Sequence, residues 1–463
     1  MVVQHNMQAA NANRMLNVTT SAQSKSTEKL SSGYRINRAA DDAAGLTISE
    51  KMRKQIKGLD RASTNAEDGV SAVQTAEGAL TEVHSMLQRM NELATQSANG
   101  TNSNTDRKAI QDEIDQLTTE IDRVSETTKF NETYLLKGDG AEKAHNVNAH
   151  DAGLDGVTLT DKGDTVDVTL KTLNAGDKVS IAGKNYTIGA TAADAQKIVD
   201  AQKVDGKTVT VNGTTYTYKT NQWTNADGSA ATVGGAAGSI TIKGGDVVSD
   251  GTKTLTAMKD GADAAGADGI DDNDSTVITA GKAYQLQTAE IVKASSIGTD
   301  TAAAVKNGAN ADKDATATFT LNKGTVSYKD ALSFNLHVGA DADMTNKITV
   351  NIDSMNSAGL GVKGIKADTE QDATYAIDAI ADAISTVSSQ RSSLGAVQNR
   401  LEHTINNLDN VVENTTSAES RIRDTDMAEE MVNYSKNNIL AQAGQSMLAQ
   451  ANQSNQGVLS LLQ

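Results

Sequence analysis

One uninterrupted helical pattern constrains what this chain can fold into. Between residues 46 and 97, apolar residues recur in steps of three and four, which keeps them on one face of a helix. The chain has no proline to break this pattern. At about 1.5 Å per residue, a continuous helix here would be roughly 75 to 80 Å long, which exceeds the width of an ordinary domain. Such a helix must lie against other long helices. The apolar positions are Met52, Ile56, Leu59, Ala66, Val70, Val73, Ala76, Leu80, Val83, Leu87, Met90 and Ala94.

Two later segments repeat the helical spacing. One runs from about residue 105 to 128, and a polar turn at 97–100 separates it from the long helix. The short turn predicts that this second helix folds back antiparallel on the first. Helical spacing returns at about residue 373 and continues to a polar linker at 420–426, so this last segment supplies the long partner that the first helix needs.

Both ends of the chain have a thinner apolar stripe. A helix of this kind is marginal in isolation and needs packing partners. Gly33 follows two serines and predicts the end of the first helix, because glycine commonly follows a helix C-terminus. The sparse apolar positions at the two ends include Met7, Leu16, Leu30, Leu440, Met447, Leu448, Leu459 and Leu462.

The middle of the chain, from about residue 140 to 330, changes to alternating Thr/Val segments separated by Gly and Asp. Its clearest hairpin covers 209–216, where Asn212-Gly213 supplies the two-residue turn. A shorter helix is predicted at 192–201. A second hairpin, from strands at 333–338 and 347–352, closes the region.

These segments define the predicted fold class: mainly α with a β-rich insert. We expect a long antiparallel, coiled-coil-like helix bundle built from both termini, with one or more small β domains in the centre. The expected domains are the terminal helices (1–42 with 421–463), a long-helix rod with a β-hairpin (43–140 with 330–420) and a β-rich outer region (141–329). Nesting of this kind brings the two termini together.

Composition excludes several classes of protein. A formal net charge of −17 argues against a protein that tracks nucleic-acid phosphates, and the absence of cysteine excludes disulfides and thiolate chemistry. The first residues lack the basic start and apolar core of a cleavable signal peptide. No run of about 18 apolar residues is present, so no membrane insertion is expected. With only 3% aromatic residues, the chain suits a protein stabilised by repeated contacts with copies of itself.

Four sequence runs resemble those of the bacterial flagellins, the flagellar filament subunits. They are LSSGYRINRAADDAAGL at 30–46, LATQSANG at 93–100, LGAVQNRL at 394–401 and SRIRDTDMA at 420–428. The resemblance covers about residues 1–140 and 330–463. The middle matches only in role, as the variable outer region of that family.

This resemblance implies a structural subunit that self-assembles into an extracellular filament for swimming. It also implies export, unfolded, through the flagellar type III apparatus without signal cleavage, and terminal helices that fold fully only on assembly. The end residues given above become the expected self-assembly contacts. The implied partners are other copies of the chain, an export chaperone, hook-junction and cap proteins, and the host's toll-like receptor 5. No enzymatic activity, cofactor or metal is expected.

The resemblance assigns three residues to the receptor contact: Arg89, Leu93 and Glu113. Arg89 and Leu93 are four residues apart and share one face of the long helix. Glu113 lies on the helix that folds back beside it. The alternative interpretation is that the two charges are ordinary solvated groups and that Leu93 packs within the protein. Both interpretations hold together if the receptor contacts a surface otherwise used between subunits.

Competing functions have weaker support. A hook-filament junction protein shares the nested plan of the termini, but both terminal signatures match filament subunits. A filament-displayed carbohydrate-binding adhesin would use Trp223, near Tyr216 and Tyr218, to stack on a sugar. Packing in the core of a small β domain is the favoured role for these three residues.

No catalytic or metal-binding pattern stands out from the background. The histidines are scattered and none has His-Glu-x-x-His spacing; they are His5, His84, His145, His150, His337 and His403. His145 and His150 meeting in a loop is one interpretation, and two solvated loop histidines is the favoured one. Residues 359–364 match G-x-G-x-x-G without the strand and helix that a dinucleotide site needs, so a flexible turn is expected there.

Overall fold

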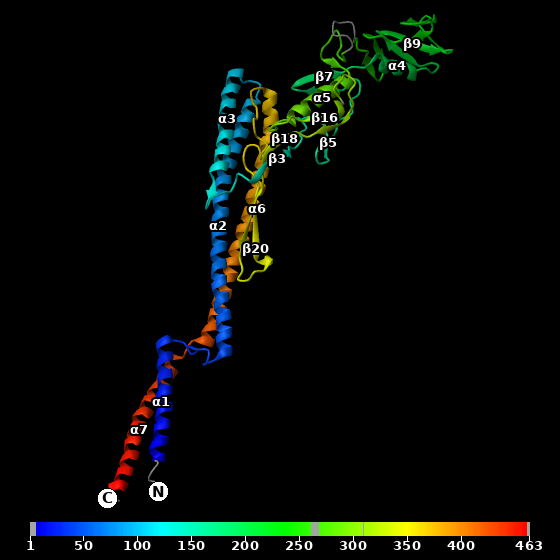
Figure 1. Cartoon of the computed structure of the whole chain (residues 1–463). Helices are drawn as coiled ribbons and strands as arrows, with labels where there is room; N and C mark the ends of the chain where they lie inside the picture. Colours follow the sequence, from blue (N-terminus) through cyan, green and yellow to red (C-terminus); the bar gives the residue numbers. More distant parts are fainter. Residues whose placement is uncertain (1–5, 261–267, 309, 461–463) are drawn as a thin grey trace. The chain divides into compact units, whose positions relative to one another are not determined.

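The structure, a computed structural model, describes residues 6–260, 268–308 and 310–460. Two compact units divide the chain. Unit 1 comprises the described parts of Met1–Ser71, Phe334–Val350 and Ala396–Gln463, and unit 2 comprises those of Ala72–Ser333 and Asn351–Gly395. The fold is mainly helical with a β-rich insert, as predicted (Figure 1).

The long helices lie where the apolar spacing places them. The α-helices are α1 (Met7–Ser32), α2 (Ala43–Ser97), α3 (Asn104–Thr127), α4 (Ala192–Ala201), α5 (Ala280–Ala294), α6 (Glu370–Arg423) and α7 (Met427–Ser460), and the 3-10 helices are η1 (Lys306–Gly308) and η2 (Met344–Asn346). Gly33 ends α1 with a positive φ of 78°, as predicted from its place after two serines. The predicted polar linker at 420–426 is partly wrong, because α6 continues to Arg423, where two arginines in the last turn favour the helix C-terminus.

In unit 1, α2 and α6 pack together through the predicted apolar stripes. Leu59 and Ala62 of α2 contact Leu408 of α6, and one turn further along Ala66 contacts Leu401. The two helices are antiparallel, because the numbers of the contacting residues increase along α2 while those of their partners decrease along α6. The predicted hairpin is present as β19 (Leu332–His337) and β20 (Lys347–Ile352), and Ile348 joins the same cluster.

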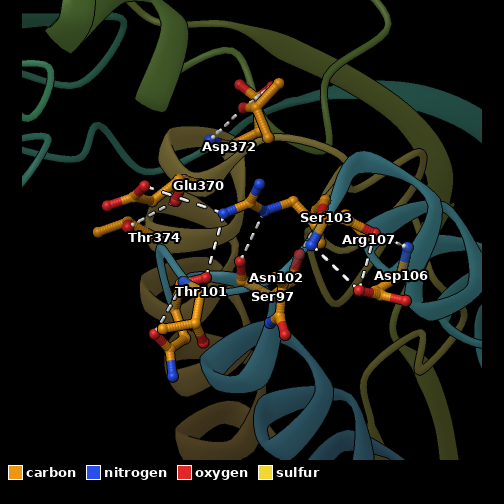
Figure 2. Close-up of polar contacts among 12 residues, drawn as sticks. Ser97, Thr101, Asn102, Ser103, Asp106, Arg107, Glu370, Asp372 and Thr374 are labelled. Atoms are coloured by element: carbon orange, nitrogen blue, oxygen red, sulfur yellow. Dashed lines mark hydrogen bonds and ion pairs between the residues drawn. The ribbon is translucent and has the colours of Figure 1, made fainter.

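In unit 2, α3 folds back on α2, and Arg107 closes the turn between them. Its guanidinium is buried and donates from Nε to the Ser97 carbonyl at 3.0 Å and from Nη2 to the Asn99 carbonyl at 3.1 Å. The Ser97 carbonyl is the last of α2, where no intrahelical donor is available, and the Asn99 carbonyl lies in the turn that follows. A further ion pair, 3.9 Å long, joins Arg107 to Glu370 at the start of α6 (Figure 2).

Besides the β19–β20 hairpin, several small sheets lie between α3 and α6 in the sequence, most of them in the insert. The largest has the order β10-β9-β8-β13-β14, and the others are β16-β17-β5-β4, β15-β7-β6, β18-β3, β11-β12 and β1-β2. The strands are β1 (Lys129–Phe130), β2 (Thr133–Tyr134), β3 (Asp139–Asn146), β4 (Thr158–Asp161), β5 (Thr165–Thr169), β6 (Lys178–Ile181), β7 (Lys184–Ile188), β8 (Thr208–Val211), β9 (Thr214–Lys219), β10 (Gln222–Thr224), β11 (Thr232–Val233), β12 (Ser239–Ile240), β13 (Val247–Ser249), β14 (Thr254–Thr256), β15 (Val277–Ile278), β16 (Ala304–Val305), β17 (Thr318–Asn322) and β18 (Thr325–Asp330).

Local turn chemistry explains the predicted elements of the insert. Asn212 and Gly213 have φ values of 51° and 82°, the paired positive angles of a primed turn, and they join β8 to β9. Helix α4 has the predicted bounds and begins with a capping box between Thr191 and Asp194. Helix α5 was not predicted. It packs through Tyr284 and Ile291 on the sheet that contains β5 and β17.

Trp223 lies in a core, which confirms the favoured interpretation and removes the sugar-stacking one. Its side chain is 1% exposed, and its ring meets that of Tyr218 edge-on at 5.0 Å between centroids. The turn expected at 359–364 is present, but Val362 within it is fully buried, so the turn is packed and not a free connection.

The favoured account of two solvated loop histidines is wrong. His145 lies in β3 and stacks on Tyr328 with 4.0 Å between ring centroids. His150 is buried, and its Nδ1 lies 2.7 Å from the carboxylate of Asp378 on α6. Each imidazole therefore has its own partner within unit 2.

Leu401→Ala tests the α2–α6 contact in unit 1. Leu401 is fully buried, so truncation should lower the free energy of unfolding of unit 1 by about 2–5 kcal/mol. Denaturant unfolding of the monomeric chain, followed by circular dichroism, measures the change. The control Ile439→Ala removes an exposed side chain from α7 and should change the value by less than about 0.5 kcal/mol. Equal effects of the two substitutions would contradict the assignment of the core.

Candidate assembly interface

The two terminal helices pair with each other in unit 1. Helices α1 and α7 lie side by side and antiparallel (Figure 1). Asn6, which precedes α1, accepts a hydrogen bond from the Ala9 amide at 2.9 Å and so caps the helix. Its Nδ2 donates to the carbonyl of Ala451 in α7 at 3.2 Å. The start of α1 is therefore held next to the late turns of α7.

A groove of about 750 Å³ runs along the α1–α7 pair. Its lining is mostly apolar or small, with Met15 and Leu16 from α1 facing Leu440, Gly444 and Met447 from α7. Gly444 permits the close approach of the helices, since a Cβ there would lie 3.3 Å from Cδ1 of Leu16. The groove extends over residues 8–19 of α1 and 440–454 of α7, and its polar lining residues are Gln8, Asn11, Thr19, Gln450 and Ser454.

The same helices expose large apolar side chains to solvent. A monomeric soluble protein normally scatters such residues singly, and a concentration of them indicates a surface that another protein covers. On this pair they are Met7, Met15, Val18, Met427, Met431, Val432, Ile439, Leu440 and Met447. The thin stripe predicted from the sequence is therefore divided between the α1–α7 contact and this uncovered face.

A cluster of backbone and arginine contacts joins the linkers that flank α1 and α7. The Arg35 amide donates to the Arg423 carbonyl at 2.7 Å, and the Thr425 amide donates to the Gly33 carbonyl at 3.0 Å. The guanidinium of Arg423 lies over the Tyr34 ring, 4.8 Å from its centroid, in a cation–π geometry. These contacts fix the two linkers to each other at the base of the helix pair.

Glu50 of α2 extends this cluster. Its carboxylate accepts a hydrogen bond from Arg423 at 2.7 Å, and this bond is the main reason that the pKa of Glu50 falls below its ordinary value of 4.5. The neighbouring Asp41 also has a lowered pKa, chiefly because it accepts the backbone amide of Arg38. Both carboxylates are therefore held in the charged form.

The predicted self-assembly residues fall into three groups. Met7, Leu440 and Met447 are exposed, whereas Leu16, Leu30 and Leu448 are partly buried. Leu459 belongs to α7, and Leu462 lies outside the described residues. Their contacts with other copies of the chain stay a prediction.

The three predicted receptor residues come together in unit 2. Nε of Arg89 lies 2.9 Å from a carboxylate oxygen of Glu113, and both side chains are about half exposed. Hydrogen bonding to Glu113 raises the pKa of Arg89 above its usual value. Leu93 differs from its two neighbours because it is only 2% exposed. The exposed chemistry of this site is thus the Arg89–Glu113 pair, and Leu93 packs in the core.

Sequence reasoning gave no site role to Tyr34, Arg35, Glu50 or Arg423. The available signal was the presence of arginines inside two short polar linkers, at 34–42 and 420–426. Which residues these arginines contact depends on the meeting of segments nearly four hundred positions apart, which spacing along the chain does not reveal.

Metal binding and membrane insertion are two further functions to consider. Among residues 6–260, 268–308 and 310–460, no group of three or more His, Asp or Glu side chains is placed to hold a metal ion. Within those same ranges, every helix is too short or too polar to cross a membrane.

Glu50→Gln tests the linker cluster through pH. Because the folded state lowers the pKa of Glu50, its stabilising effect is complete above pH 4.5 and is lost as the pH falls through the lower, folded value. The melting temperature of the parent chain should therefore fall more steeply below pH 4.5 than that of the variant. The matched control is Glu67→Gln, at an exposed glutamate of the same helix. A parallel pH profile for parent and Glu50→Gln would contradict the role of this pair.

Comparison with known proteins identifies the family. The bacterial flagellin N-terminal helical region matches residues 3–141, and the flagellin C-terminal helical region matches residues 377–462. A flagellin of Clostridium tyrobutyricum is 41% identical over 98% of this chain and 100% of its own length. Flagellin C of Vibrio cholerae is 36% identical, and flagellin B of Vibrio anguillarum is 33% identical, each over 99% of both chains. The chain belongs to the bacterial flagellin family, whose members are structural subunits of the extracellular flagellar filament.

Proposed function

We propose that this filament subunit polymerises through the exposed faces of α1 and α7. The observation that carries the proposal is the concentration of exposed apolar side chains on these two helices, beside an unfilled groove. Full burial of one such side chain contributes about 1.5–3 kcal/mol, so copies that cover each other's faces gain a large total. The resulting contact repeats from subunit to subunit and produces a filament.

The terminal helices gain most of their stability from this contact. In proteins, most of a helix's stability comes from the tertiary packing of its apolar face and not from its own propensity. In the single chain that packing is limited to the α1–α7 pair, where Ala441 is one of the few buried apolar residues. Assembly supplies the missing partners. Residues 141–329 serve as the variable outer region, with 43–140 and 330–420 as the rod.

We propose that export and capping proceed as they do for the flagellins that this chain is similar to. On this proposal the chain leaves the cell unfolded through the flagellar type III apparatus, and an export chaperone covers its apolar ends until then. Hook-junction and cap proteins contact the filament at its two ends. The chain has no enzymatic activity of its own.

Toll-like receptor 5 of a host contacts this protein through the Arg89–Glu113 pair. Support comes from the geometry of the site: a partly exposed, hydrogen-bonded charge pair presents a defined donor and acceptor to a partner. Leu93 acts beneath the pair, because its burial in the core holds the helix face in position.

Ile439→Asp tests the assembly face. Ile439 is exposed in the single chain, so the charge costs little in the monomer but must be desolvated in the filament. We expect no filaments by electron microscopy after seeding, whereas the parent chain forms tubes. Met344→Asp, at an exposed position in η2, is the matched control and should polymerise normally. Filaments from Ile439→Asp, or from a chain that lacks residues 1–30 and 431–463, would contradict the proposal.

Arg89→Ala tests the receptor contact. Loss of the guanidinium should raise the protein concentration needed for half-maximal toll-like receptor 5 signalling about tenfold, since a central arginine contact typically contributes more than about 1 kcal/mol. Arg123→Ala is the control, because Arg123 of α3 also forms an exposed ion pair, with Glu120. Equal signalling by the two variants would contradict a contact between Arg89 and the receptor. Reporter cells that express the receptor provide the measurement.

A further inference from the structure

Methionine is concentrated on the exposed faces of the terminal helices. Met7, Met15, Met427, Met431 and Met447 are between 48% and 73% exposed, and all five belong to α1 or α7. By contrast, three methionines of unit 2 are nearly or fully buried: Met90, Met258 and Met355. Five of the most exposed methionines thus lie on the face through which the chain is proposed to polymerise, and Met344 of η2 is an equally exposed one outside it.

Two of these methionines have a defined position in the groove. Met15 of α1 and Met447 of α7 both line the channel of about 750 Å³, together with Leu16 and Leu440. Methionine suits such a channel because its side chain is unbranched and polarisable and adapts to a partner's surface. The same thioether also reacts with oxidants, which leucine in its place would not do.

The chemistry of the exposed thioether is a two-electron oxygen transfer. The sulfur attacks one oxygen of a peroxide, an S–O bond forms, and the O–O bond breaks. The sulfur is oxidised to a sulfoxide, and hydrogen peroxide is reduced to water, with no net change in protons. The product replaces an apolar group by a strong hydrogen-bond acceptor, which disrupts methionine-rich interfaces.

We propose that these five methionines are a modification site for peroxide-class oxidants, and that their oxidation stops free subunits from polymerising. The inference rests on the proposed assembly through α1 and α7. Met15 and Met447 lie in the groove beside Leu16, Leu440 and Ala443, so in the filament their sulfoxide oxygens would lose water where these apolar side chains offer no donor; the polar side chains that share the lining include Asn11, Thr19 and Gln450. Subunits already assembled keep the same thioethers covered. Oxidation therefore acts on the free subunit and spares the finished filament.

Oxidation of the full-length chain before seeding tests this inference. Monomer is treated with hydrogen peroxide, peptide mass spectrometry locates the sulfoxides, and sedimentation measures the critical concentration for polymerisation. We expect an increase of about tenfold or more, the usual scale for burying one unsatisfied polar group. Treatment with both stereospecific methionine sulfoxide reductases should restore the original value. Filaments treated in the same way should show far less oxidation at Met15 and Met447 than the free monomer.

Variants separate this inference from the proposed function. A chain with leucine at all five positions should polymerise equally well before and after peroxide. Met344→Leu removes an equally exposed methionine outside α1 and α7, and it should stay as sensitive as the parent. Normal polymerisation of the parent with sulfoxides at all five positions overturns the inference and leaves the proposed function intact. An untreated parent chain that does not polymerise overturns both. Should the five-leucine chain fail to assemble, the reductase experiment decides alone: recovery supports the inference, and its absence overturns it.

Discussion

The antiparallel packing of α2 against α6 is the contact on which unit 1 depends. Leu59, Ala62 and Ala66 meet Leu408 and Leu401 along one apolar seam, and the β19–β20 hairpin adds Ile348 to it. Two segments that are more than three hundred residues apart in the chain thereby form one body. The linkers at 34–42 and 420–426 leave this seam at the same place, and for that reason they are close enough to share the Arg423, Tyr34 and Glu50 contacts.

Much of the helical framework can be predicted from the sequence because periodicity alone specifies it. The apolar stripe between 46 and 97 predicted α2, and the stripe from 373 predicted α6. In a helix of known period, the position of a residue in the sequence determines the side of the helix on which it lies. Helix α5 escaped prediction for the opposite reason. Its buried face includes Gln287, Thr288 and Glu290, which interrupt the apolar stripe. Glu290 pairs locally with Lys293, but its hydrogen bond from Tyr375 exists only once the chain has folded.

The residues of the candidate sites also fall into two classes: those that sequence periodicity predicts and those that only the fold reveals. The apolar end residues were predictable, because a thin stripe without a partner already indicates a face to be covered. The arginine contacts were not, since a guanidinium on a polar linker has many possible acceptors and only the fold selects the carbonyl or carboxylate that it meets. The burial of Leu93 beside the exposed Arg89 belongs to this second class. Residues four apart share a helix face, but the edge of the buried stripe runs between these two.

The pairing of Asn6 with Ala451 has a practical consequence for protein engineering. Affinity tags or fusion partners attached to either end of the chain would enter at the α1–α7 pair, the surface on which polymerisation is proposed to depend. The turn at Asn212 and Gly213 is a better point of attachment. It is exposed, it has positive φ angles that glycine-rich spacers reproduce, and it belongs to unit 2. A guest peptide placed there would be displayed on a scaffold whose terminal helices keep their native sequence.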